Sequence, residues 1–205
     1  MRGKFIVLEG IDGSGKSTLA QKLRERLDAK GVSAVWVRDP GSTPVSAAIR
    51  GLLLDPRNTD IKPMTELLLY CASRAQLLQE VILPALERGE NVVSDRFYYS
   101  TFAYQGARAV MPEDRLHRLV LTAAGNIEPD LAILLDAPAA VCLGRIKREH
   151  DRMESLGGEY MEKVRGLYLR ALEKLPENRK LILDAAQPPE TSLARAAAAV
   201  EALLR

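Results

Sequence analysis

Histidine, cysteine and tryptophan are rare in this chain, whose 205 residues include two His, two Cys and one Trp. His117 and His150 fall in no spacing typical of metal ligands or of a Ser-His-Asp triad, which leaves zinc hydrolases and serine hydrolases with little support. Cys71 and Cys142 lie in apolar contexts and form no Cys-x-x-Cys motif. We therefore expect two reduced core thiols and a cytoplasmic location.

An excess of one charge is also absent, because 29 basic residues face 27 acidic ones and leave a net charge of +2. No nucleic-acid partner is expected, since duplex binding usually requires a strongly basic face. No apolar run approaches the length that spans a membrane, and we expect neither an export signal nor a membrane anchor. The hydrophobic content of 47% suffices for one core, which predicts a single domain over 1–205.

Short apolar runs alternate with helical patterns along the chain. The runs cover residues 5–8, 34–37, 92–93, 131–135 and 181–183, and their continuous apolar character is typical of strands buried on both faces. Helices are predicted at 16–30, 43–54, 62–88 with a bend near Pro84, 112–124, 139–149, 159–175 and 189–204. This alternation predicts an α/β fold with a parallel sheet and helices on both faces.

Polar residues at the ends of these strands are the first candidates for chemistry, because ligands of open α/β sheets bind beyond the carboxyl ends of the strands. Arg38 and Asp39 follow one strand, and Asp95 and Arg96 follow another. The planar guanidinium of Arg96 suits phosphate oxygens. Two further strand-end carboxylates are expected to face solvent or to act as structural caps, namely Asp136 and Asp184.

A glycine-rich segment directly after the first predicted strand fits Gly-x4-Gly-Lys-Ser, the pattern of a phosphate-binding loop. This loop consists of Gly10, Ile11, Asp12, Gly13, Ser14, Gly15, Lys16, Ser17 and Thr18. Its glycines let backbone N–H groups turn toward phosphate oxygens, the next helix adds its positive N-terminus, and Lys16 would neutralise the outer phosphates. The segment predicts a triphosphate site, and the alternative is a glycine-rich turn without a ligand.

Mg²⁺ is the expected cofactor of such a site. The hydroxyl of Ser17 can ligate the ion, and the carboxylate of Asp95 can approach it through water, because Mg²⁺ keeps part of its hydration shell. The metal role of Asp95 is indicated only in combination with the upstream loop, since any strand can end in Asp.

Two later segments have compositions typical of binding sites. Five of the ten aromatic residues fall within 97–104, which is consistent with a base-stacking pocket or with a small aromatic core cluster. Residues 145–154 carry five potential cations, counting His150, and precede Gly157 and Gly158. A mobile basic flap over phosphates would have this composition, and so would a solvated helix end.

In combination, these motifs resemble bacterial thymidylate kinases along nearly the whole chain. The matching residues are 7–18, 38–43, 72–76, 95–97 with Ser100 and 103–106, 129–131, and 151–154. The resemblance implies the P-loop kinase fold with a five-stranded parallel sheet, a lid at about 144–158, and a homodimer. It also implies transfer of the ATP γ-phosphoryl group to dTMP, which yields dTDP and ADP.

The resemblance further implies roles for individual residues. Those implied to bind dTMP are Asp12, Asp39, Arg50, Tyr70, Arg74, Arg96, Thr101, Tyr104 and Gln105. Catalytic roles are implied for Lys16, Arg96, Asp12, Arg148 and Arg152, and ATP binding for residues 10–18. Tyr70 would stack on thymine, Arg74 would hydrogen-bond it, and Tyr104 would lie near the 2′ position of the sugar.

The lid is where this chain carries its extra cations. The phosphate-binding loop has Gly13-Ser14 and no Arg, whereas the lid has Arg145, Lys147, Arg148 and Arg152, so the chain resembles the bacterial lid-arginine type. Departures from the family pattern are Asp39 where Glu is usual, Ser42 where a second Gly is usual, and Tyr70 where Phe is frequent.

The acceptor phosphate needs no general base, because it is mostly dianionic at neutral pH, and positioning with charge neutralisation is enough. One alternative is another nucleotide or nucleoside kinase of the P-loop class. A nucleoside acceptor would require Glu9 or Asp39 as a base. A more remote alternative is a regulatory P-loop NTPase, although the chain has no Asn-Lys pair of the kind that reads guanine.

Overall fold

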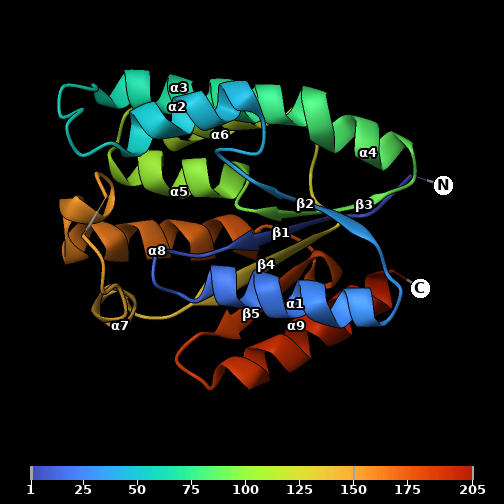
Figure 1. The fold of residues 1–205 in the computed structure, drawn as a ribbon. Coiled ribbons are helices and arrows are strands. Elements are labelled where there is room, and N and C mark those ends of the chain that lie inside the picture. Colours follow the sequence, from blue (N-terminus) through green and yellow to red (C-terminus); the bar gives the residue numbers. More distant parts are fainter. Residues whose placement is uncertain (1, 150, 205) are drawn as a thin grey trace.

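A five-stranded parallel sheet forms the centre of the computed structural model, which describes residues 2–149 and 151–204 (Figure 1). Its strands are β1 (Phe5–Glu9), β2 (Ala34–Arg38), β3 (Asn91–Asp95), β4 (Leu131–Asp136) and β5 (Lys180–Asp184). They lie in the order β2-β3-β1-β4-β5, and every neighbouring pair is parallel. The predicted α/β fold with a five-stranded parallel sheet is confirmed.

Helices cover both faces of this sheet, as predicted. In Figure 1, α1 (Lys16–Ala29) and α9 (Pro189–Leu203) lie side by side below the sheet. Above it lie α2 (Pro44–Leu54), α3 (Pro63–Leu77), α5 (Tyr98–Ala107) and α6 (Glu113–Ala123), and α8 (Gly158–Glu173) packs along α5. The shorter helical segments are η1 (Leu78–Ile82), α4 (Leu83–Glu87), α7 (Ala139–Gly144), η2 (Glu154–Leu156) and η3 (Glu177–Arg179).

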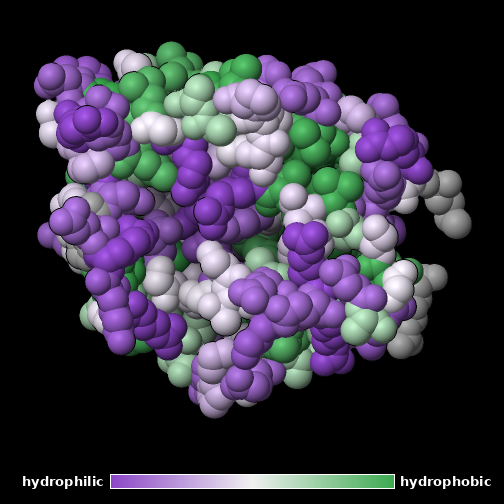
Figure 2. Space-filling model, viewed as in Figure 1, coloured by the Kyte–Doolittle hydropathy of each residue, from purple (hydrophilic) through white to green (hydrophobic). Residues whose placement is uncertain are grey.

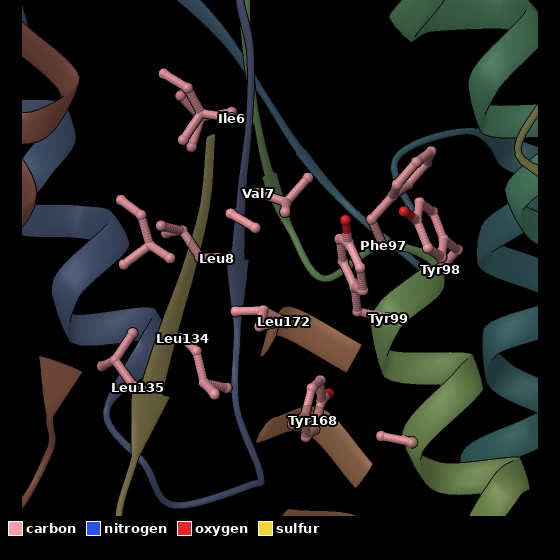
Figure 3. Close-up of a cluster of buried hydrophobic side chains, with 14 of the residues drawn as sticks. Ile6, Val7, Leu8, Phe97, Tyr98, Tyr99, Leu134, Leu135, Tyr168 and Leu172 are labelled. Carbon is pink, nitrogen blue, oxygen red and sulfur yellow. The ribbon is translucent and has the colours of Figure 1, made fainter. Parts of the chain in front are cut away.

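The central strand β1 is buried on both of its faces. Figure 3 shows Ile6 and Leu8 on the side of α1, and Val7 on the opposite side with Phe97 and Tyr99. All five of these side chains are buried. Because both faces are covered by helices, the strand reads as a continuous apolar run rather than an alternating one.

The helix α5 is the main feature that the sequence pattern did not predict. Residues 98–105 of this helix are all buried, so no amphipathic period marks them as helical. Phe97, just before the helix, packs edge-on against Phe5 with ring centroids 5.0 Å apart. All five aromatic residues of the segment belong to the core cluster, which was one of the two alternatives, and Tyr104 also lines a pocket described below.

Two predicted helices differ in extent from the observed ones. The predicted helix 139–149 was too long, because α7 ends at Gly144 and the charged residues that follow offer little apolar surface to bury. The guanidinium of Arg145 instead donates to the Ala185 carbonyl at 2.9 Å. The predicted helix 62–88 is divided into α3, a π-helical turn and α4. That turn precedes Pro84, which has no N–H to donate to the helix.

The two strand-end carboxylates outside the site differ in their surroundings, because Asp184 is exposed, as expected, whereas Asp136 is held in an ion pair with Arg165. Asp136 accepts hydrogen bonds from the Arg165 guanidinium at 2.7 and 2.9 Å, and Asp184 accepts one from the Ala186 N–H at 2.8 Å. Cys71 and Cys142 are buried free thiols, as predicted. Within the part of the chain that the structure describes, no helix combines the length and apolar character needed to cross a membrane.

Candidate functional site

The phosphate-binding loop joins β1 to α1 at the carboxyl edge of the sheet. Gly10, Gly13 and Gly15 have φ values of 142°, 81° and 95°, which L side chains rarely adopt. A Cβ atom on Gly13 would lie 2.0 Å from the Cys142 carbonyl oxygen, so this position also requires glycine for space. The loop can therefore approach its neighbours closely and present its backbone to an anion.

The ammonium group of Lys16 lies inside this loop. It donates to the carbonyl oxygens of Gly10 and Ile11 at 2.8 and 2.9 Å. Burial lowers the pKa of Lys16 to about 8, and the nearby positive charge of Arg96 acts in the same direction. An anion placed beside the ammonium would favour its charged form.

A broad cavity of about 690 Å³ opens in front of the loop, and Figure 2 shows a hollow in this face with hydrophilic residues around it. Basic side chains dominate its walls: Lys16, Arg38, Arg50, Arg96, Arg145 and Arg148. The acidic side chains on the walls are Asp12, Asp95 and Asp151. This charge balance and the adjacent helix N-terminus suit a polyphosphate. We call this space the phosphate cavity.

A narrower pocket of about 60 Å³ adjoins the phosphate cavity. Its walls include all nine residues predicted to bind the acceptor: Asp12, Asp39, Arg50, Tyr70, Arg74, Arg96, Thr101, Tyr104 and Gln105. Five residues line both spaces: Asp12, Arg50, Leu54, Arg96 and Asp151. The structure thus brings the predicted acceptor residues to one place, which we call the acceptor pocket, although their roles stay predictions.

Arg96 stands at the junction of the two spaces. It adopts φ 75°, a strained conformation for a residue with a side chain. Its guanidinium donates to the Asp12 carboxylate at 2.6 Å, to the Gly10 carbonyl at 2.9 Å and to the Tyr168 hydroxyl at 2.9 Å. Tyr104 donates to the other Asp12 oxygen at 2.7 Å. These contacts fix the direction of the guanidinium.

Asp12 is an acid inside an anion-binding loop, and its surroundings keep it ionised. Burial alone would raise the pKa of this carboxyl, but the charges of Arg96 and Lys16 hold it well below its usual range. The carboxylate therefore offsets part of the positive charge and orients Arg96 rather than standing free beside a phosphate.

Glu9, which the sequence indicated only as the base of an alternative function, binds the residues beside Arg96. Its completely buried carboxylate accepts the Phe97 N–H at 2.8 Å and the Ser100 hydroxyl at 2.6 Å. Ser100 in turn contacts the Tyr168 hydroxyl at 2.6 Å. Burial raises the pKa of Glu9 to about 7, although the Ser100 hydrogen bond and the Arg96 charge oppose this. Two sequence signals pointed to Glu9, namely its position at a strand end and its place in the matched segment 7–18.

Arg74 and Asp39 form a buried ion pair at the back of the acceptor pocket. The Arg74 Nε donates to Asp39 Oδ2 at 2.6 Å, and its Nη2 donates to the Thr101 hydroxyl at 2.6 Å. Within residues 2–149 and 151–204, the buried Nη1 of Arg74 and Oδ1 of Asp39 have no hydrogen-bond partner. One donor and one acceptor thus remain for a ligand that enters the pocket.

Ser17 and Asp95, the predicted Mg²⁺ ligands, lie close together, since the guanidinium of Arg38 contacts both of them. Arg38 Nη2 is 2.9 Å from Asp95 Oδ2 and 3.4 Å from the Ser17 hydroxyl. The other Asp95 oxygen is buried without a partner among the described residues. Burial would raise the pKa of Asp95, yet the charges of Lys16, Arg96 and Arg38 lower it. An ionised carboxylate beside a hydroxyl fits Mg²⁺, which takes oxygen ligands and retains water.

The predicted lid cations lie in two different places. Arg145 and Arg148 line the phosphate cavity, and Arg148 also pairs with Glu154 at 2.7 Å. Arg152 lies outside that cavity. Its Nη2 is 2.5 Å from a Glu66 oxygen. This placement favours Arg148 or Arg145 over Arg152 as the group near a transferred phosphate.

A further cavity, which the sequence did not indicate, adjoins the phosphate-binding loop and shares Gly15, Thr18 and Arg145 with the phosphate cavity. It has a volume of about 260 Å³ and lies between the start of α1, the end of β4 and the start of α9. Its walls are partly apolar: Leu19, Leu135, Pro189 and Leu193, with Arg145 at its edge. Because this space adjoins the loop, it suits the base of a nucleotide whose phosphates the loop holds.

Comparison with known proteins supports a single family. A model of the family described as "Thymidylate kinase" matches residues 8–195. The chain is 43% identical over 206 residues to a thymidylate kinase of Ectopseudomonas mendocina, and 44% identical over 206 residues to one of Pseudomonas fluorescens. Both alignments cover 100% of this chain and 96% of the relative. A thymidylate kinase of Bifidobacterium longum subsp. infantis is 41% identical over 209 residues, covering 100% of this chain and 89% of the relative.

Proposed function

The chain belongs to the thymidylate kinase family, and on that premise we propose that its two adjoining spaces hold the two phosphate groups between which phosphoryl transfer occurs. The reaction is the ATP-dependent phosphorylation of dTMP to dTDP. The observation that carries the proposal is that the phosphate cavity and the acceptor pocket share wall residues, among them Asp12 and Arg96.

The donor side consists of the phosphate-binding loop and the cavity beyond it. The loop amides and Lys16 would hold the phosphates of ATP, and the partly apolar cavity beside α9 would take its base. Ser17 and Asp95 would hold Mg²⁺, which would offset the charge of the transferring phosphoryl group. Arg148 and Arg145, from the proposed lid at 144–158, would add positive charge from the opposite side.

The acceptor side is the narrow pocket. Arg96 would grip the dTMP phosphate, with Arg50 nearby, while Arg74 and Thr101 would face the base and Tyr70 would stack on it. No general base is needed, since the attacking phosphate oxygen already carries charge at neutral pH. Catalysis would then rest on alignment and on preorganised positive charge.

An acceptor panel tests this proposal. ADP release should be strong with dTMP, weaker with dUMP and absent with thymidine, because only a nucleoside monophosphate brings an ionised acceptor. Strong turnover of thymidine would instead favour a nucleoside kinase with a base at Glu9 or Asp39. A marked preference for GTP without any acceptor would favour a regulatory NTPase.

We also propose that two copies of the chain associate through α2 and α3. These helices expose four large apolar side chains, Val45, Leu52, Met64 and Leu68. Apolar side chains exposed together are typical of association surfaces. Sedimentation velocity should give a mass near twice that of one chain, and a monomer at micromolar concentration would refute the dimer. A cytoplasmic location is proposed with the two free buried thiols as support.

A further inference from the structure

Glu66 on α3 is a buried carboxylate that belongs to neither of the two spaces described above. It is completely inaccessible to solvent, and three side chains from other parts of the chain approach it. Arg152 Nη2 and Arg108 Nη1 lie 2.5 and 3.6 Å from its Oε2, as ion pairs without hydrogen-bond geometry, and Gln105 Nε2 donates to its Oε1 at 2.9 Å. A buried charge with this many partners is a strong positional restraint, because losing a partner leaves the charge uncompensated.

The contact with Arg152 fixes the short segment 151–154. The Arg152 side chain is only 10% exposed, and its Nε also donates to the Leu53 carbonyl at the end of α2 at 2.8 Å. Its neighbours Asp151 and Met153 line the acceptor pocket. The Asp151 carboxylate accepts the Met153 N–H at 2.9 Å, so the turn is internally braced as well. Anchoring Arg152 therefore sets where this wall of the pocket lies.

The contact with Gln105 reaches the same pocket from α5. Gln105 lines the acceptor pocket, and its NH₂ group is committed to Glu66. Its Oε1 is buried and has no hydrogen-bond partner among the described residues. Since Glu66 holds the NH₂ group, the orientation of the whole amide plane is restricted, and with it the direction in which the carbonyl oxygen points. Glu66 thus orients one wall of the pocket directly and another through Arg152.

We propose that Glu66 is a positioning residue for the acceptor pocket and that Arg152 anchors segment 151–154 to α2 and α3 instead of contacting the transferred phosphate. This inference rests on the acceptor site proposed above. It differs from the sequence-based expectation, in which Arg152 is catalytic.

Limited trypsin digestion tests the anchor without any substrate. Trypsin must take the arginine side chain into its own pocket, and the largely enclosed side chain of Arg152 resists this. Glu66→Gln keeps the shape of the side chain but removes its charge, and cleavage after Arg152 should accelerate about tenfold or more, because cleavage follows the population of the released segment. The matched control, Arg108→Met, removes the other cation near Glu66 and should change this rate less than about twofold. Equal rates for wild type and Glu66→Gln would overturn the anchor.

Steady-state kinetics separate positioning from catalysis. Glu66→Gln and Arg152→Met should each raise the KM for dTMP about tenfold and change kcat less, and the double variant should be no worse than either single one, because both remove the same contact. A fall in kcat for Arg152→Met alone, or additive effects in the double variant, would refute the proposal.

The double variant also guards against misfolding, since it removes both charges together and leaves neither one unpaired. Circular dichroism checks the fold of each variant, and if the single variants do not fold, a double variant with wild-type KM refutes the proposal. Absence of dTMP turnover in the wild-type protein would contradict the proposed function but leave the digestion test of the anchor intact.

Discussion

Glu9→Gln should remove a pH dependence from the stability of the protein. The carboxyl of Glu9 is completely buried beneath Arg96, and burial raises its pKa from 4.5 to about 7. Glutamine has nearly the same shape, and its amide carbonyl can still accept the Phe97 N–H that Glu9 now accepts at 2.8 Å. The substitution therefore tests the charge of residue 9 with little change in packing.

The sign and size of the effect follow from proton linkage. Between pH 4.5 and 7, the folded protein holds a proton on Glu9 that the unfolded chain has released, so the free energy of unfolding falls as the pH rises. Each pKa unit corresponds to about 1.4 kcal/mol. From pH 5 to pH 8 the wild-type protein should thus lose about 2–3 kcal/mol that the Gln variant does not lose.

Urea unfolding of both proteins at pH 5, 6, 7 and 8, at one protein concentration, measures this difference. The free energy of unfolding of the variant, minus that of the wild type, should be lower at pH 5 than at pH 8. Most of this change should occur below pH 7. Glu25→Gln on the exposed face of α1 is the matched control and should follow the wild type at every pH. Parallel stability profiles for wild type and Glu9→Gln would show that Glu9 does not titrate in this range.

Four further substitutions probe the loop, the reacting centre and the surface. Gly13→Ala should cost more than about 2 kcal/mol, because its Cβ would meet the Cys142 carbonyl and its φ is 81°; an unchanged melting temperature would contradict this. Lys16→Ala and Arg96→Ala should each lower kcat/KM at least about a hundredfold, which is the typical effect of losing one preorganised charge. Near-normal turnover in folded variants would refute the assignment of the site. Leu68→Asp should shift the protein to a monomer in sedimentation, since it places a charge on the exposed apolar face of α3; an unchanged mass would exclude that face.

The sheet could be predicted from sequence because its strands are buried on both faces and read as short apolar runs. The same logic failed for α5, whose residues 98–105 are also buried all round and therefore show no helical period. In the segment 139–149, by contrast, the predicted helix was longer than the observed one. Residues 145–149 have helical propensity but little apolar surface to pack. The local sequence pattern distinguishes a helix from a strand when one face of the element is buried and the other is exposed. It cannot do so when every face is buried or when none is.

The residues of the acceptor pocket could be predicted, although only Asp12, Asp39 and Arg96 follow from the loop motif and the strand ends, and the other six were implied by the family resemblance. Their supports could not be predicted, because each supporting contact joins positions far apart in the chain. Glu9 meets Ser100, Arg96 meets Tyr168, and Glu66 meets Arg152. A buried carboxylate such as Glu66 gives no local signal beyond its presence on an apolar helix face, so only the tertiary structure reveals its partners.

The cations of the site share one physical feature, since each already has a partner within the protein. Lys16 donates to its own loop, Arg38 holds Asp95, Arg74 holds Asp39, and Arg96 holds Asp12. On the proposed function, phosphate oxygens would join these partners around the cations, so the folded protein does not have to hold unpaired positive charges together before the substrates bind. The carboxylates would keep directing the guanidinium groups, and little reorganisation would be needed when charge moves during phosphoryl transfer.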